Sequence, residues 1–468
     1  MRAFKLLIDG ALVDGVDVID VINPATEEVT NVCPVADEGM LNQAVAAAKA
    51  AFPAWSARPL AERAALVDQL ADAVLAHAEE FARLLTEEQG KPTPQAMFEV
   101  HGTAFTLKAF TQMTLDPKVL RDDAQGRVVE HRAPLGVVAS ITPWNFPLIL
   151  LANKLGPALV AGNTMVAKPA PTTPLTTLLF GELARDILPA GVLNIICDNN
   201  DLGGLLTAHP DIAKVAFTGS TATGKKVMAS ASGTVKRVTL ELGGNDAAIV
   251  LDDVDPVEIA GKVFDGAMVN AGQVCVAIKR AYVPEAMYDP FCDELARLAK
   301  AAIVDDGFKQ GTQVGPVQNR AQYEKLKNLL AETRDAGNVI AGGDALDRPG
   351  FFIAPTIVRD IAEDASLVQD EQFGPVLPVM SYSDIEDVIA RANASDYGLA
   401  GTVWGKDLDR ASAVAARIDS GTVWVNQHLA IDATIPFRGA KQSGLGGELG
   451  QDGLHEYTQA RIVNAVAL

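Results

Sequence analysis

The segment AGQVCVAIKR, residues 271–280, places one cysteine between two valines, directly after a Gly-Gln turn. A thiolate is a strong nucleophile, so Cys275 is a candidate for covalent catalysis, although a free cysteine in an apolar frame is more commonly a small buried hydrophobe. Glu241, in the segment LELGG, is a carboxylate that follows apolar strand residues. Burial would raise its pKa, which suits a general base, whereas an ion pair at a domain junction is the alternative interpretation.

Three further turns follow apolar strand candidates. In TPWNFP, Asn145 lies between two aromatic residues, and its amide either satisfies a backbone group or points its NH₂ at a developing oxyanion. Lys168 ends the strand TMVAK, where it can reach a ribose hydroxyl or a phosphate or remain solvated. In FTGSTATG, Gly219 and Gly224 lie where helix N–H groups can receive a phosphate. Because the third glycine of the usual fingerprint is missing, a tight turn explains these glycines equally well.

Composition excludes several classes of function. The chain has 468 residues, which predicts two or three domains, and its 49% hydrophobic content allows large cores. A net charge of −20 argues against a nucleic-acid partner and gives no reason to expect binding to anionic membranes. We expect no signal peptide, no membrane span and a cytoplasmic location. The four cysteines contain no CxxC pair and the histidines form no ligand pair, so we expect no disulfide and no metal site.

Hydrophobic patterning predicts an α/β fold. An apolar stripe from Leu60 to Leu85 predicts a helical region that ends at EEQGKP. From residue 135, strands that are apolar on both faces alternate with helices, as in doubly wound parallel sheets. The alternation resumes after Gly243-Gly244, which predicts two such domains meeting there. The segments GRVVEHRAP and ARIVNAVAL are strand-like and fit neither core, so they could pair with another subunit.

Six segments occur along the chain in one order: ITPWNFP, KPAP-x-TP, FTGS, LELGGNDA, GQVC and EQFGPV. This set resembles the aldehyde dehydrogenase superfamily, of the NAD(P)-dependent type that does not acylate coenzyme A. The resemblance covers nearly the whole chain, and Glu241 precedes Cys275 by 34 positions, the spacing that this family shows. It implies two Rossmann-like parallel-sheet domains plus a small β oligomerisation element. Residues 1–119 and 135–243 would bind the dinucleotide, 244–445 would form the catalytic domain, and 120–134 and 455–468 would supply oligomerisation strands.

The resemblance also gives the chemical groups their roles. Its catalytic set is Cys275, Glu241, Asn145 and Lys168. Cys275 would attack an aldehyde carbon, and the Asn145 amide and the Cys275 backbone N–H would hold the oxyanion. Hydride transfer to NAD, with NADP also accepted, would leave a thioester that a Glu241-activated water hydrolyses. The expected product is therefore a carboxylic acid, and the expected assembly is a homodimer or homotetramer.

The binding residues carry over in the same way. The cofactor contacts implied are Thr142, Pro143, Trp144, Lys168, Pro171, Gly219, Ser220, Gly224, Leu242, Glu371 and Phe373. The residues implied to line the aldehyde tunnel are Phe146, Ile149, Leu150, Asn153, Val269, Val274, Val276, Leu429, Ile431 and Phe437. Because nearly all of this lining is apolar, the substrate expected is an aliphatic or aromatic aldehyde.

This sequence departs from the family pattern at three positions. Pro171 stands where a carboxylate is common, which leaves the preference between NAD and NADP open. Arg438 stands where glycine is usual, and Gly447 where arginine is common. None of the three removes a catalytic group, although Arg438 could place a charge in the otherwise apolar tunnel.

Three other functions compete with this interpretation. A cofactor-independent thiol hydrolase would need a histidine base, and no histidine lies in a recognisable motif with the cysteine. A binding protein derived from an enzyme would usually have lost the nucleophile or the base. A dehydrogenase that passes the acyl group to coenzyme A would generally lack the carboxylate present at Glu241.

Overall fold

The apolar strands of the N-terminal half pair in one eight-stranded sheet. In spatial order its strands are β2 (Ala11–Val13), β1 (Leu6–Ile8), β9 (Leu193–Ile195), β8 (Thr164–Lys168), β7 (Val137–Ile141), β10 (Ile212–Thr218), β11 (Arg237–Glu241) and β21 (Gly444–Leu445). The five strands from β9 to β11 run parallel, whereas β1, β2 and β21 join as antiparallel pairs. The structure is a computed structural model that describes residues 2–467. Met1 and Leu468, the outermost residues of the ranges 1–119 and 455–468, lie outside the described residues.

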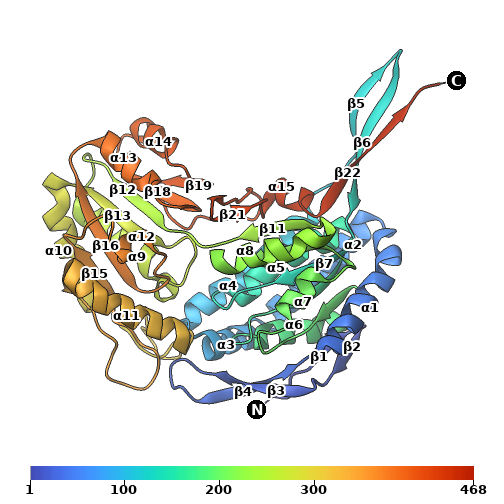
Figure 1. Cartoon of the computed structure of the whole chain (residues 1–468), viewed down its shortest axis with the longest axis horizontal. Coiled ribbons are helices and arrows are strands. Elements are labelled where there is room, and N and C mark those ends of the chain that lie inside the picture. The colour runs from blue at the N-terminus through green and yellow to red at the C-terminus, as the bar shows by residue number, and fades with distance from the viewer. Residues whose placement is uncertain (1, 468) are drawn as a thin grey trace.

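Helices cover both faces of this sheet (Figure 1). They are α1 (Glu38–Ser56), α2 (Leu60–Ala76), α3 (Ala78–Gln89), α4 (Thr93–Thr111), α5 (Pro147–Ala161), α6 (Leu175–Arg185), α7 (Gly203–Ala208) and α8 (Thr221–Ala231), with a short turn η1 (Ser232–Thr234) after them and a hairpin of β3 (Asp17–Ile22) and β4 (Val29–Val35) at the periphery. The apolar stripe predicted as one helical region forms two helices, because the chain bends at His77. Both helices pack on α4, and α2 also packs on α5 while α3 also packs on α6.

A second, seven-stranded sheet follows Gly244. Its strands, in spatial order, are β14 (Asn338–Ala341), β15 (Thr356–Arg359), β16 (Val376–Tyr382), β13 (Ile278–Pro284), β12 (Asp246–Val250), β18 (Ala400–Trp404) and β19 (Thr422–Val425). Its other elements are α9 (Pro256–Met268), η2 (Val269–Gly272), α10 (Glu285–Ala301), α11 (Arg320–Ala336), α12 (Ser366–Gln369), α13 (Ile385–Asn393), α14 (Leu408–Ala415) and a ribbon of β17 (Tyr397–Gly398) with β20 (Ala440–Lys441). All its pairs are parallel except β14–β15. The predicted α/β class with two doubly wound sheets is therefore confirmed.

One short strand from the C-terminal part of the chain joins the first sheet. Strand β21 lies within the range 244–445 that was assigned to the second domain, yet it pairs with β11 of the first sheet, with Gly444 opposite Glu241. Helix α15 (Gly450–His455) follows it, and Leu454 is buried in the core of the first unit. The chain therefore returns from the second sheet across the edge of the first.

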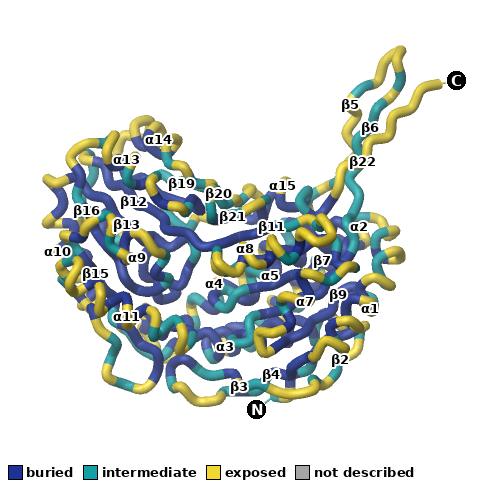
Figure 2. Tube along the Cα trace, viewed as in Figure 1, coloured by how far each residue is buried: buried dark blue, intermediate teal, exposed yellow. Residues whose placement is uncertain are grey.

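A third sheet projects from the body of the molecule (Figure 1). It consists of β5 (Lys118–Asp123), β6 (Gly126–Pro134) and β22 (Thr458–Ala465), all antiparallel. Most of its length is exposed, in contrast to the buried strands of the two main sheets (Figure 2). Both segments that were predicted to fit neither core thus pair with each other in this sheet.

Strand register aligns the chemical groups at one edge of the first sheet. Thr218 is opposite Glu241, Phe217 is opposite Ile141, and Ile141 is opposite Lys168. These residues end four adjacent parallel strands, so the turns that follow emerge together at the carboxyl edge, where ligands of open α/β sheets bind. Within residues 2–467, no helix is both long and apolar enough to cross a membrane.

Candidate active site

The turn before Cys275 has an unusual backbone. Asn270 and Ala271 have φ angles of 51° and 55°, and Gly272 has a φ of 69°. Three consecutive left-handed residues, two of them not glycine, are strained and need surrounding contacts to persist. The Gln273 side chain supplies some of these contacts, because it donates to the Asn270 carbonyl at 2.9 Å and accepts from the Gln318 N–H at 2.8 Å.

Cys275 is the one half-buried cysteine of the four, since Cys33, Cys197 and Cys292 are fully buried. Burial raises the pKa of the Cys275 thiol to about 12, and the ammonium of Lys279 opposes this rise. The carboxylates of Glu371, Asp246 and Glu241 raise the same pKa further. The thiol therefore lies within the electrostatic reach of Glu241.

Glu241 is buried at the end of β11. Neither of its carboxylate oxygens has a hydrogen-bond partner in the described part of the chain. Burial raises its pKa well above the ordinary value, and the charge of Glu448 adds to that rise, whereas Lys154 lowers it. A buried carboxyl group with free oxygens and a raised pKa is suited to take a proton from water.

A buried ion pair lies beside Glu241. The Lys154 ammonium donates to Glu448 at 2.7 Å and to the Thr218 hydroxyl at 2.6 Å. Glu448 also accepts from the Asn153 side chain at 3.3 Å. Lys154 and Glu448 therefore act in opposite directions on the pKa of Glu241, in addition to the rise that burial causes.

The two glycines after Glu241 let this segment approach Cys275 and Glu371 closely. A Cβ atom at Gly244 would lie 2.5 Å from the Cys275 carbonyl oxygen, and one at Gly243 would lie 2.4 Å from a carboxylate oxygen of Glu371. Larger residues would push these groups apart. The Gly244 N–H also donates to Glu371 at 3.0 Å, so the LELGG motif is in contact with both partners.

Asn145 is buried and anchors the cysteine turn. Its Nδ2 donates to the Gln273 carbonyl at 3.0 Å, which leaves the second amide hydrogen for another acceptor. Its own backbone carbonyl accepts from Lys91 at 2.9 Å and from Asn270 at 3.1 Å. The two interpretations of the Asn145 amide, as a backbone partner and as an oxyanion donor, are therefore compatible. One N–H bonds the backbone, while the other remains free.

Two buried carboxylates support the turns at this edge. Glu99 forms an ion pair with Lys91 and accepts from the Leu148 N–H at 2.9 Å, at the first turn of α5. Glu88 accepts from the Leu175 N–H at 2.7 Å, at the first turn of α6. Both helices follow strands of the carboxyl edge, so these carboxylates fix how the edge turns enter their helices.

Most of the expected cofactor residues follow strands of this edge, whereas Glu371 and Phe373 lie between α12 and β16 of the second sheet. The rings of Trp144 and Phe373 meet edge to face at 5.3 Å, and Glu371 precedes Phe373. Ser220 caps α8, whose first turn consists of uncharged residues, so its N–H groups are suited to receive a phosphate. Gly219 and Gly224 lie against Phe217 and Leu242, so close packing by itself accounts for both glycines. Thr142 is buried, with its N–H on the Lys168 carbonyl, while Pro143 and Pro171 are half-buried.

Lys168 is not a solvated lysine. Its ammonium is buried and donates to Asp198 at 2.5 Å. Asp198 follows β9, the neighbour of β8, and its other oxygen accepts from the Leu202 N–H at 2.9 Å. A carboxylate thus lies beside Lys168 even though Pro171 does not supply one. The edge, together with Phe373 of the second sheet, therefore presents a cation, an aromatic pair and a helix N-terminus, which are groups suited to a dinucleotide.

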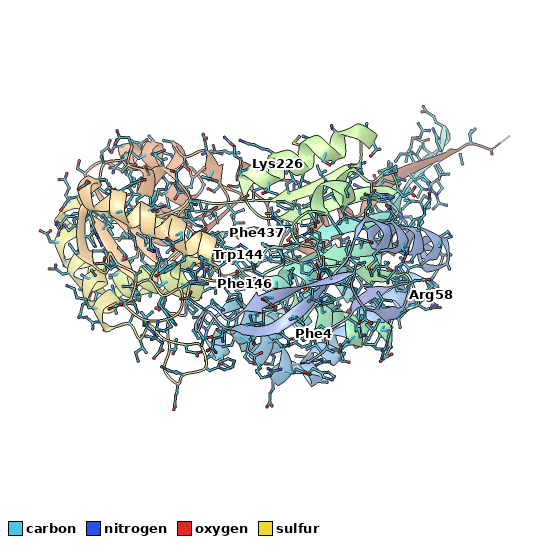
Figure 3. All side chains as sticks on the ribbon, turned by 60° about the horizontal axis from the view of Figure 1, so that its bottom comes forward. Phe4, Arg58, Trp144, Phe146, Lys226 and Phe437 are labelled. Atoms are coloured by element: carbon cyan, nitrogen blue, oxygen red, sulfur yellow. The ribbon has the colours of Figure 1, made fainter. Side chains whose placement is uncertain are left out.

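Most of the expected tunnel residues gather around the thiol. One apolar cluster contains Cys275 together with Phe146, Val269, Val274, Val276, Leu429 and Phe437. Figure 3 shows the labelled Trp144, Phe146 and Phe437 in the region between the two α/β units. The other expected lining residues are Ile149, Leu150 and Asn153 on α5 and the exposed Ile431.

Arg438 and Gly447, the two departures from the family pattern near the C-terminus, pack against each other. A Cβ atom at Gly447 would lie 2.8 Å from Cγ of Arg438, so the arginine side chain covers this glycine. The Arg438 guanidinium forms an exposed ion pair with Asp452. Its charge is therefore neutralised at the surface.

Several residues of the site were not identified from the sequence. Lys91 lies in EEQGKP, which patterning marks only as a helix stop, and Asp198 follows a short strand without any motif. His428 donates from Nε2 to the Val276 carbonyl at 2.7 Å, and burial lowers its pKa to about 4. In the described residues no histidine is hydrogen-bonded to the Cys275 thiol, so the histidine-dependent hydrolase has no base in position.

The strand edge and the cysteine turn together define an α/β enzyme with a thiol and a carboxylate in one site. The model of the aldehyde dehydrogenase family matches residues 13–463. The phenylacetaldehyde dehydrogenase of Pseudomonas fluorescens is 39% identical over 98% of this chain and 95% of its own length. A solved structure described as a putative aldehyde dehydrogenase from Burkholderia cenocepacia superposes with a TM-score of 0.97 at 38% identity, covering 99% of this chain and 98% of that one.

A third comparison concerns the cofactor. Betaine aldehyde dehydrogenase from Staphylococcus aureus, solved in complex with NAD⁺ as a point mutant, superposes with a TM-score of 0.96 at 32% identity, covering 98% of this chain and 95% of that one. The chain belongs to the aldehyde dehydrogenase family and is an NAD(P)-dependent oxidoreductase.

Proposed function

We propose that this enzyme oxidises apolar aliphatic or aromatic aldehydes to carboxylic acids through a covalent intermediate on Cys275. The observation that carries this proposal is the combination of a half-buried thiol with a buried Glu241 whose carboxylate oxygens are both free. The two groups interact electrostatically, and Gly244 lets the chain that follows Glu241 pass close to the Cys275 carbonyl.

The first step forms a bond between the Cys275 sulfur and the aldehyde carbon, while the thiol proton leaves to a base. The aldehyde oxygen then carries the negative charge of a thiohemiacetal. The Cys275 backbone N–H and the free Nδ2 hydrogen of Asn145 stabilise that charge. The bond from Asn145 to the Gln273 carbonyl supports this role, because it holds the amide beside the turn.

Bound NAD(P)⁺ would supply the hydride acceptor that turns the thiohemiacetal into a thioester. Trp144, Phe373 and Glu371 would hold its nicotinamide end, Ser220 at the start of α8 its phosphates, and Lys168 its adenine ribose. Cys275 is then acylated, so the cycle closes only when the acyl group leaves.

Glu241 removes the acyl group by activating water. Its carboxylate takes a proton from water, whose oxygen attacks the thioester carbon, and the Cys275 thiolate departs as the carboxylic acid forms. Both Glu241 oxygens lack partners in the described part of the chain, which supports this role over that of a structural ion pair.

The substrate class follows from the surroundings of the thiol. The cluster that contains Cys275 is apolar, and the one nearby departure that adds charge, Arg438, is paired with Asp452. The phenylacetaldehyde dehydrogenase relative acts on an aromatic aldehyde by its name, which agrees with such a lining. The ammonium groups beside this cluster, those of Lys91 and Lys279, already pair with Glu99 and Glu371, so a carboxylate-bearing semialdehyde would find no free counter-charge there.

We further propose that the protein forms a homodimer or homotetramer and works in the cytoplasm. The exposed three-stranded sheet supports the first proposal, because exposed sheet edges favour pairing with another chain. Four cysteines without disulfides support the second, because they are typical of a reducing compartment.

A panel of aldehydes tests the proposed reaction. NADH formation is measured with phenylacetaldehyde, medium aliphatic aldehydes and succinic semialdehyde, with and without coenzyme A. We expect the highest kcat/KM for the apolar aldehydes, a carboxylic acid as product and no requirement for coenzyme A. Succinic semialdehyde as the best substrate would contradict the apolar specificity, and acyl-CoA as the product would contradict hydrolysis.

A further inference from the structure

Lys279 is a buried cation beside the nucleophile that the proposed reaction leaves without a role. It belongs to the Lys-Arg pair four and five residues after Cys275, and only 1% of its surface is exposed. Arg280 bonds the carbonyls of Asn245 and Ala392, which makes it part of the fold. The Lys279 ammonium instead donates to the Val274 carbonyl at 2.8 Å and to the Cys275 carbonyl at 2.6 Å.

The bond to the Val274 carbonyl acts on the proposed oxyanion site. The Val274 C=O and the Cys275 N–H belong to the same peptide group. An ammonium on the carbonyl oxygen withdraws electron density from that group and makes its N–H a stronger donor, as hydrogen bonds in chains polarise one another. Lys279 therefore strengthens the backbone donor that would hold the oxyanion.

The same ammonium faces the segment that would hold the nicotinamide. Its Nζ lies 3.5 Å from a carboxylate oxygen of Glu371 and 6.0 Å from the centre of the Phe373 ring. The Lys279 carbonyl accepts from the Gln372 side chain at 3.1 Å. Lys279 thus contacts Glu371, Gln372 and Phe373 on one side and the cysteine turn on the other.

We propose that Lys279 is a positioning residue that polarises the Val274–Cys275 peptide and ties the cysteine turn to Glu371. The inference rests on the proposed role of Cys275. The electrostatics agree with this proposal. The Lys279 ammonium opposes the rise in the pKa of Cys275, whereas Glu371, Asp246 and Glu241 increase that pKa. Lys279 thereby offsets the carboxylates that face the thiol.

Alkylation of the enzyme without cofactor tests this role. Iodoacetamide reacts with the thiolate, and the other three cysteines are buried, so its rate reports on Cys275. Lys279→Met removes the charge at similar side-chain length. The thiol pKa should therefore rise, because Lys279 lowers it in the wild-type enzyme. Because a more basic thiolate is also more nucleophilic, alkylation at about pH 8 should slow about three- to tenfold.

Glu371→Gln provides a test with the opposite sign. Glu371 raises the pKa of Cys275, so its removal should speed alkylation by a similar factor. Lys262→Met is the matched control, because it removes an equal charge from an exposed pair with Glu258 and should leave the rate unchanged. A merely structural role for Lys279 would not produce opposite changes in two variants that fold.

Steady-state kinetics complete the test. Lys279→Met should lower kcat with the preferred aldehyde and raise KM for NAD, because both the oxyanion donor and Glu371 lose their support. An alkylation rate within twofold of wild type in a folded Lys279→Met protein would overturn the inference. If that variant does not fold, an unchanged rate in Glu371→Gln would overturn it. Failure of the wild-type enzyme to oxidise any aldehyde would instead contradict the proposed function.

Discussion

Cys275 is half-buried in its apolar cluster, whereas Cys292 is fully buried in the core of the second unit. Cys275→Ala should lower aldehyde oxidation and any esterase activity by about a thousandfold or more, because the nucleophile begins both reactions. Cys292→Ala is the control and should retain turnover with a modest loss of stability. Appreciable aldehyde oxidation by the Cys275 variant would contradict the covalent mechanism.

Replacement of Glu241 should distinguish the acylation step from the hydrolysis step. In Glu241→Gln, one equivalent of NADH should form rapidly while steady turnover collapses, because the thioester forms but is not hydrolysed. Stopped-flow absorbance measures both phases. Should Glu241 also assist deprotonation of Cys275, the rapid phase would shrink as well. Unchanged steady turnover would exclude Glu241 as the base.

Lys154 lies beside Glu241 and opposes the rise in the pKa of its carboxyl group. The pKa of Glu241 is raised, so the rate of hydrolysis should increase with pH as this carboxyl group ionises. Lys154 lowers that pKa, and Lys154→Met should therefore move the acidic limb of kcat to higher pH. The pH profile of kcat measures the shift. A limb that stays in place, or moves to lower pH, would show that Lys154 does not act on Glu241.

At the scale of elements, the ends of β8 and β9 bear on cofactor choice. Lys168 ends β8, and its ion pair with Asp198, after β9, leaves the ammonium less available to a 2′-phosphate. We therefore expect NAD to be preferred, with measurable NADP activity because Pro171 carries no charge. Asp198→Asn should release Lys168 and raise kcat/KM for NADP relative to NAD about fivefold, since a contact of this kind is worth roughly 1 kcal/mol. Equal changes for both cofactors would place the pair away from the adenine ribose.

Pro171 offers the complementary substitution in the turn after β8. A carboxylate at this position can bond the ribose hydroxyls of NAD and repel the 2′-phosphate of NADP. Pro171→Glu should therefore lower kcat/KM with NADP more than with NAD. Initial rates with each cofactor give the two kcat/KM values. Equal decreases in kcat/KM for NAD and NADP would show that residue 171 does not face the adenine ribose.

At the scale of the whole molecule, the projecting sheet carries an unpartnered apolar row. Val119 and Val463 both pair with Val129 across the strands, so their side chains share one face. Val119 and Val463 are 47% and 46% exposed, far from the two cores. An exposed apolar row of this kind favours contact with another subunit.

Val463→Asp tests whether this face forms the proposed oligomer. Light scattering should give the wild-type enzyme the mass of a dimer or tetramer, and the variant a smaller mass, because burying a charge between subunits is costly. Val257→Asp introduces the same charge at an equally exposed position on α9 and should not change the mass. A monomeric wild type would contradict the proposed assembly.

The fold class and the place of the site could be read from the sequence because both depend on local pattern. Strands of parallel sheets are buried on both faces, so β7, β8 and β12 appear as continuous apolar runs. Ligands bind at the carboxyl ends of such strands, which singles out the residues that end them. The break at His77 escaped prediction because the apolar stripe continues across it, and both helices use that stripe to pack on α4.

The buried charges of the site were decided by tertiary structure. Lys154 and Glu448 are 294 positions apart in the sequence. Lys91 donates to the Asn145 carbonyl, which is 54 positions away. No periodicity links such partners, and a lysine near a turn looks solvated when its sequence is considered by itself. Lys168 and Lys279 are buried because the fold brings Asp198 and Glu371 to them. A charged group can leave water only where partners are already in place, and those partners come together only when the whole chain has folded.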